Sequence, residues 1–150
     1  MSSMFFARCE TTVISYIDSS CMIRRLVGDG PPLETWGAWD AAVSSEVGRI
    51  EVHRTLARLL HEGRLNGSGW AEAGQRFKEI EEGILWIPLT PRVSAVAAGP
   101  LPTVLKALDA IHLASAAFVR ETSGPVLTFA THDRQLATAA VAMSFDVAGV

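Results

Sequence analysis

The chain has 150 residues, of which 49% are hydrophobic and 19% are charged, and its formal net charge is −3. This composition excludes wholesale disorder, and the acidic balance argues against a protein that binds nucleic acid through its overall charge. The length suits a single domain over residues 1–150, with residues 1–11 as a leader that need not be regular.

No segment is expected to cross or to be targeted to a membrane. The longest uncharged run, 93–105, contains two prolines and is shorter than the roughly 20 apolar residues of a spanning helix. The N-terminus lacks the apolar core of a secretory signal, and two cysteines, Cys9 and Cys21, are too few to indicate a disulfide framework. We therefore expect a cytoplasmic protein with reduced thiols.

Strands and helices alternate in the first half of the chain. Residues 13–17 are β-branched and aromatic, which is typical of a buried strand, and a helix is expected over 20–27. A second helix begins at Ser44 or Ser45 and ends near Gly63, and another covers 69–82. Residues 84–87, just before a proline, predict the second strand.

The same alternation continues to the end. Residues 93–98 predict a short helix, and Thr103 is expected to cap a longer helix rich in leucine and alanine. The third strand is expected at 126–130, a helix at 134–143 and a last strand at 145–148. This order indicates an α/β fold, a three-layer α/β/α sandwich around a central, mainly parallel sheet.

Four carboxylates occur where such a fold gathers side chains at one end of its sheet. Asp18 and Asp133 follow strands, while Glu51 and Asp109 lie on helical stretches. Ligands of these folds sit beyond the carboxyl ends of the strands. Several carboxylates in a small volume repel one another unless a hard divalent cation holds them. The pattern therefore predicts a Mg²⁺ or Mn²⁺ site and phosphate chemistry.

Each acid also has a plainer interpretation. Asp18 and Asp133 could serve only as helix N-caps, and Glu51 could lie on a solvated helix face. Asp109 is harder to explain in this way, because aspartate is unfavourable inside a helix and a metal or a hydrogen-bond network must offset its cost. His112, three positions later, is expected to support the site rather than to bind a hard metal.

Four segments taken together resemble the PIN-domain ribonucleases, specifically the VapC-type toxins of toxin–antitoxin pairs. The segments are YIDSS (16–20), RIEVHR (49–54), LDAIHLA (108–114) and THDRQLA (131–137). The metal-binding and catalytic acids of the family fall on Asp18, Glu51, Asp109 and Asp133, and its supporting hydroxyls on Ser20 and Thr131. Cys21, His132 and the long leader depart from the family pattern, but none of them removes a carboxylate.

The resemblance implies a Mg²⁺- or Mn²⁺-dependent endoribonuclease toxin of a type II system. Asp18, Asp109 and Asp133 would hold the metal, and Glu51 would ligate it, orient water or accept a proton. The implied partners are RNA, a second copy of the chain in a homodimer, and a cognate VapB-like antitoxin that inserts a peptide into the acidic pocket. Basic residues near the acids in sequence or on one helix face are candidates for attracting RNA: Arg24, Arg25, Arg54, Arg58, His61 and Arg134.

Other functions remain open at this point. One alternative is a Mg²⁺-dependent phosphatase or a DNA nuclease, although a dehalogenase-like phosphatase would need a second aspartate at Ser20. Another is a catalytically silent PIN-like module that only binds RNA or a protein. Cys21 is not expected to act as a nucleophile, because no paired base can be identified.

Overall fold

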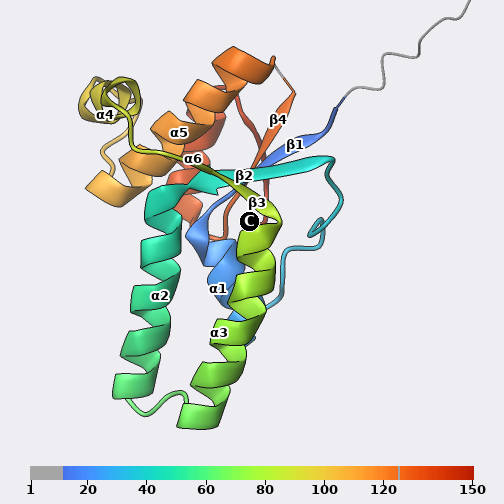
Figure 1. The fold of residues 1–150 in the computed structure, drawn as a ribbon. Coiled ribbons are helices and arrows are strands. Elements are labelled where there is room, and N and C mark those ends of the chain that lie inside the picture. Colours follow the sequence, from blue (N-terminus) through green and yellow to red (C-terminus); the bar gives the residue numbers. More distant parts are fainter. Residues whose placement is uncertain (1–11, 125) are drawn as a thin grey trace, which may run out of the picture.

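The computed structural model describes residues 12–124 and 126–150, so the predicted leader and Cys9 lie outside the described residues. Strands and helices alternate along the described chain (Figure 1). The strands are β1 (Ile14–Ile17), β2 (Ala41–Ser45), β3 (Ile84–Ile87), β4 (Leu127–Ala130) and β5 (Asp146–Ala148). The helices are α1 (Ser19–Val27), α2 (Glu46–His61), α3 (Gly67–Glu82), α4 (Pro91–Ala98), α5 (Ala107–Ser123) and α6 (Arg134–Ala142).

The strands form one parallel sheet in the order β3-β2-β1-β4-β5. The central strand β1 ends at Ile17, which pairs with Ala130 at the end of β4. Asp18 and Thr131 follow directly, and the Asp18 N–H donates to the Ala130 carbonyl at 3.0 Å. The sheet register therefore places two residues that are far apart in sequence next to each other.

Helices cover both faces of the sheet. Successive residues of a strand point to opposite faces, so Tyr16 and Ile17 pack against different helices. Tyr16 packs into a core cluster with residues of α5 and α6. Ile17 packs into a second cluster with residues of α1, α2 and α3. Helix α4 lies against α5 on its outer side (Figure 1). The predicted three-layer α/β/α sandwich with a parallel sheet is confirmed.

The sequence pattern misses strand β2. Its residues, Ala-Ala-Val-Ser-Ser, have little intrinsic preference for a strand, but the chain holds them between β1 and β3. Ser44 and Ser45 are fully buried there. The helix expected to begin at Ser44 or Ser45 starts at Glu46, with the Ser45 hydroxyl accepting a hydrogen bond from the Val47 N–H at 3.3 Å.

The predicted cap at Thr103 is wrong, because α5 begins only at Ala107. The preceding segment is held outside the helix by Leu101 and Leu105, which pack against the core. Asp109 consequently lies in the first turn of α5 and not in its interior. The helix dipole favours a carboxylate in a first turn, so the position itself carries less cost than the sequence suggests.

Among the residues that the structure describes, no helix is long and apolar enough to pass through a membrane.

Candidate active site

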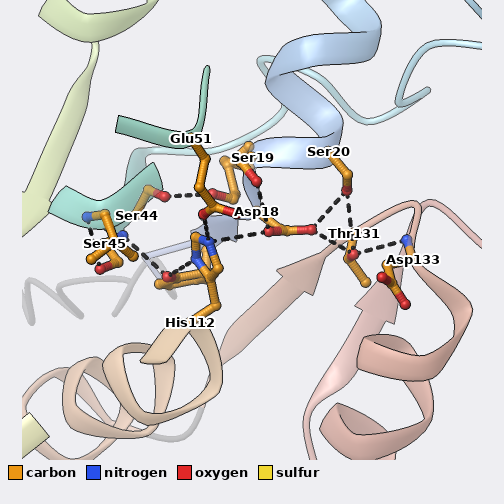
Figure 2. A network of polar contacts seen from close by, with 12 residues as sticks. Asp18, Ser19, Ser20, Ser44, Ser45, Glu51, His112, Thr131 and Asp133 are labelled. Carbon is orange, nitrogen blue, oxygen red and sulfur yellow. Dashed lines mark hydrogen bonds and ion pairs between the residues drawn. The ribbon is translucent and has the colours of Figure 1, made fainter. Parts of the chain in front are cut away.

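Asp18 is a buried carboxylate held by two hydroxyl groups. Its Oδ2 accepts hydrogen bonds from Ser20 Oγ at 2.7 Å and from Thr131 Oγ1 at 2.8 Å (Figure 2). The residue is only 3% exposed. Asp18 occupies the N-cap position of α1, yet its side chain makes no capping hydrogen bond. The interpretation of Asp18 as a simple cap therefore does not hold.

The two hydroxyls are themselves fixed by the turn between β4 and α6. The backbone N–H of His132 donates to Ser20 Oγ at 3.0 Å, and the N–H of Asp133 donates to Thr131 Oγ1 at 3.0 Å. Each hydroxyl oxygen thus accepts a backbone proton and directs its own proton to Asp18. The two hydroxyls thus orient the carboxylate through Oδ2, and neither of them is charged.

Asp133 has the capping role that its plainer interpretation gives it. Its Oδ1 accepts a hydrogen bond from the Leu136 N–H at 3.0 Å at the start of α6. Its Oδ2 makes no hydrogen bond with the described residues. Capping and metal binding are compatible here, because the cap fixes the side chain through one oxygen and leaves the other available. Figure 2 shows Asp133 beside Thr131.

His112 lies between Asp18, at the end of β1, and Glu51 on α2. Its Nε2 is within hydrogen-bonding distance of Glu51 Oε1 and lies 3.4 Å from Asp18 Oδ1 (Figure 2). Its Nδ1 lies 2.6 Å from the hydroxyl of Tyr16, which accepts the Ser45 N–H at 3.0 Å. The Tyr16 proton therefore points to Nδ1, and a neutral His112 carries its own proton on Nε2, facing the carboxylates.

Burial and charge act in opposite directions on His112. Burial disfavours the charged imidazole, but Asp18, Glu51 and Asp109 outweigh it and raise the pKa of His112 above its ordinary value. Burial and then the charge of Asp18 raise the pKa of Tyr16 well above its ordinary value, so its hydroxyl stays a neutral donor.

Asp109 is a partly buried carboxylate in the first turn of α5. Burial raises the pKa of its carboxyl group, and the charges of Asp133, Asp18 and Glu51 raise it further, against the opposing effect of His112. The carboxylates of Asp133, Asp18 and Glu51 are thus near enough to Asp109 to act on its charge. Glu51 is accordingly not a residue of a merely solvated helix face, because it also contacts buried His112.

The donor set fits a hard divalent cation in kind, since Mg²⁺ and Mn²⁺ prefer carboxylate oxygen. Burial is the main cause of the raised pKa of Asp109, and the neighbouring carboxylates add to it. Within 12–124 and 126–150, however, no three acidic, histidine or cysteine side chains already converge at metal-binding distance. Asp18 Oδ2 and Glu51 Oε1 are occupied by hydrogen-bond partners. Binding through water, which Mg²⁺ usually retains, agrees with this spacing.

Sequence reasoning did not identify Tyr16 as part of this network. A signal was present, because a tyrosine in an otherwise apolar strand must find a partner for its hydroxyl. Cys21 behaves as expected for a buried thiol: burial and the charge of Asp18 raise its pKa to about 12, which suppresses the nucleophilic thiolate.

The predicted basic residues lie in several places, and Arg54 is exposed on α2. Arg58 and His61 lie in the last turn of α2, at the end that points away from the sheet (Figure 1). Arg25 stacks over Trp36, with 4.6 Å between the guanidinium carbon and the ring centroid. Arg24 and Arg134 instead line a cavity beside the acids.

Comparison with a solved structure agrees on the fold. The chain superimposes on PAE2754 from Pyrobaculum aerophilum with a TM-score of 0.54 at 21% identity, covering 93% of this chain and 88% of the other. This likeness concerns the fold alone, which is PIN-like. No profile of a protein family matches the sequence.

Comparison of sequences is more specific. The chain is 30% identical over 128 residues to Ribonuclease VapC47 of Mycobacterium tuberculosis, covering 81% of this chain and 85% of the relative. It is 33% identical over 138 residues to each of Ribonucleases VapC45 and VapC49 of the same species. Each of these matches covers 89% of this chain and 93% of the relative. The chain belongs to the VapC ribonuclease family.

Proposed function

We propose that this protein is a metal-dependent endoribonuclease and the toxin of a type II toxin–antitoxin system. The observation that carries the proposal is the buried carboxylate of Asp18, which two hydroxyls hold at the carboxyl end of the central strand. His112 lies between this carboxylate and Glu51, and the charges of Asp18, Glu51 and Asp133 act on Asp109. RNA is the substrate class because the named relatives are ribonucleases.

Mg²⁺ or Mn²⁺ is the proposed cofactor, held by Asp18, Asp109 and Asp133, with Glu51 within reach. The ion would supply positive charge for the phosphate and activate water for attack. The chain itself supplies orientation: Ser20 and Thr131 fix Asp18, and His112 holds Glu51 ready to orient a water molecule or take its proton.

The same carboxylates suggest how an antitoxin would act. Four carboxylates attract any positive group, so a basic side chain of a VapB-like antitoxin could occupy the place of the metal. We propose this mode of inhibition, together with a homodimeric assembly.

The test is a cleavage assay with the full-length chain purified free of antitoxin. Labelled RNA and DNA of the same sequence are incubated with Mn²⁺, with Mg²⁺ or with EDTA. Asp18→Asn and Asp109→Asn should lower RNA cleavage at least about 100-fold, because charge stabilisation by a ligated metal supplies several kcal/mol. The matched control is Asp40→Asn, an exposed acid whose carboxylate accepts the Val13 N–H at 2.7 Å and no other hydrogen bond from the described residues.

Three other results of this assay would contradict parts of the proposal. Equal cleavage of DNA would make the protein a general nuclease. RNA binding without cleavage by the wild-type chain would make it a silent binding module. Full activity of Asp18→Asn would remove that residue from the site.

A further inference from the structure

A cavity of about 570 Å³ lies beside the acids, at the carboxyl ends of β4 and β5. Its walls come from α1, the loop after α1, the turn between β4 and α6, and the chain that follows β5. Side chains that could contact a ligand there include Arg24, Pro32, Leu33, Glu34, His132 and Arg134. Pockets of about 300–1,000 Å³ commonly hold small organic ligands, so this volume suits a nucleotide.

The cavity and the acidic site share one wall. His132 lines the cavity, and its backbone N–H donates at 3.0 Å to Ser20 Oγ, the hydroxyl that holds Asp18. Arg134 also lines the cavity and follows directly after Asp133. A molecule in the cavity would therefore be the immediate neighbour of a phosphate placed at the acids.

Two arginines, Arg24 and Arg134, line the cavity. The loop after α1 holds Arg24 in place: its Nη1 donates to the Pro31 carbonyl at 3.4 Å, and its Nε lies 4.0 Å from Asp29. The loop packs closely, since a Cβ on Gly30 would lie 3.1 Å from Arg24 Nε. Arg134 forms no ion pair with the described part of the chain. Guanidinium groups suit bidentate contact with phosphate.

The remaining lining suits a base and a ribose. Pro32 is exposed and Leu33 is buried beneath the surface, so together they offer an apolar wall. Glu34 is exposed and can accept hydrogen bonds from a base amino group, as carboxylates do with cytosine. Among the side chains that line the cavity, two arginines stand against one glutamate, and Asp29 lies 4.0 Å from Arg24 just outside the lining.

We propose that this cavity binds the nucleotide adjacent to the cleaved bond of the RNA and sets the base preference at that position. The phosphate of that nucleotide contacts Arg24 and Arg134, and its base lies against Pro32 and Leu33 within reach of Glu34. This inference rests on the proposed ribonuclease function and adds a specificity subsite that the four carboxylates do not provide.

The test measures RNA affinity separately from cleavage. Fluorescein-labelled single-stranded oligo(A), oligo(C) and oligo(U) are titrated against the full-length chain in an Asp109→Asn background, and anisotropy is recorded at several salt concentrations. The double variant Arg24→Gln/Arg134→Gln is compared with Arg54→Gln/Arg58→Gln on α2, which removes the same charge. Glu34→Gln is tested in the same way.

We expect the cavity variant to bind RNA at least about 10-fold more weakly. The slope of log affinity against log salt concentration should become shallower by about 0.7 for each phosphate that the variant no longer binds. The control on α2 should weaken binding less than about threefold, because it removes only diffuse attraction. Glu34→Gln should change the ratio of affinities among the three oligonucleotides and leave the salt dependence intact. Replacing Arg24 and Arg134 by lysine should give intermediate affinity, and the melting temperature of each variant checks its fold.

Two results would overturn the inference. Equal losses in the two arginine pairs would show that RNA responds only to overall charge, and unchanged base ratios in every cavity variant would remove the specificity role. Cleavage by the wild-type chain tests the proposed function separately. If the wild type cuts RNA and the cavity variants bind and cut as it does, the subsite alone is wrong. If the wild type does not cut while the cavity variant still loses affinity, the ribonuclease function is wrong and the RNA-binding cavity stands.

Discussion

The hydroxyl of Tyr16 lies 2.6 Å from Nδ1 of His112. By donating to Nδ1, this core residue fixes the tautomer of the neutral imidazole, in which Nε2 carries the proton and faces Glu51. Tyr16→Phe removes this hydroxyl and keeps the ring, which stacks on Phe129 with 5.1 Å between centroids. We expect kcat to fall about 10–100-fold, the usual effect of losing a group that orients a ligand or base. The KM for RNA should not change, because the buried hydroxyl does not contact substrate.

Stability must be measured with this variant, because Tyr16→Phe also leaves the buried Ser45 N–H without its acceptor, at a cost of about 1–3 kcal/mol. Val93→Ala in α4 serves as a matched control: Val93 is fully buried but lies outside the hydrogen-bond network. It should lower the melting temperature and leave kcat unchanged at temperatures where the protein is folded. An equal loss of kcat in both variants would mean that Tyr16 acts only through stability.

Asp109→Asn should make the metal-free protein more stable near neutral pH. Because the pKa of Asp109 is raised in the folded state, the folded chain keeps this proton to a higher pH than the unfolded chain does. Stability therefore falls as the pH rises from the ordinary aspartate pKa through the raised one, and asparagine escapes this loss. Thermal unfolding in EDTA across this pH range measures the effect.

The difference between Asp109→Asn and the wild type should vanish below the ordinary aspartate pKa, where both states are protonated. Asp146→Asn, at an exposed position in β5, provides the comparison for a simple loss of charge. Identical melting curves of Asp109→Asn and the wild type at pH 7 would show that Asp109 is not crowded by the other acids.

Mn²⁺ should stabilise the folded protein through the same acids. An ion that binds only the folded state adds about 2.7 kcal/mol to the free energy of unfolding at 100 times its Kd. For a chain of this size each kcal/mol raises the melting temperature by about 2–4 °C. Asp133→Asn should lose most of this gain, while the exposed Asp40→Asn should retain it. Asparagine at 133 is a good N-cap, so the helix itself is preserved. Equal shifts in all variants would place the ion elsewhere.

Gly149→Ala should destabilise the site from the segment that follows edge strand β5. Gly149 has φ +100°, and an added Cβ would lie 2.5 Å from the Thr131 carbonyl oxygen. The backbone conformation alone should cost about 1–3 kcal/mol, and relief of the overlap would displace the Thr131 hydroxyl from Asp18. Chemical unfolding and RNA cleavage should both show the loss. Gly74→Ala in α3, where an added Cβ has no neighbour within 4 Å, should instead be neutral or stabilising by about 0.5–1 kcal/mol. An unchanged free energy of unfolding in Gly149→Ala would contradict the expected strain.

The sequence predicts most of this fold because its strongest patterns are local. The apolar runs of β1, β3 and β4 and the serine cap of α2 are visible without a structure. Strand β2 is not, since its alanines and serines become a strand only between two neighbours. The start of α5 is missed for a similar reason, because Leu105 packs against the core from the segment that precedes the helix.

In the candidate site, too, local patterns can be predicted from the sequence and tertiary contacts cannot. The four carboxylates can be recognised from their order along the chain, but which of them share hydrogen-bond partners depends on tertiary geometry. The sequence suggests a cap for both Asp18 and Asp133, and only Asp133 makes one. The contact between Tyr16 and His112 joins residues 96 positions apart, and no pattern of neighbouring residues reports it.

The place of β1 in the middle of the sheet has a consequence for synthesis of the protein. Asp18 is made early, but the hydroxyl of Thr131 that holds it comes 113 residues later. A nascent chain leaving the ribosome thus carries its first acid long before the pocket exists. The hydrogen-bonded site of Asp18 can therefore form only after the ribosome has synthesised Thr131.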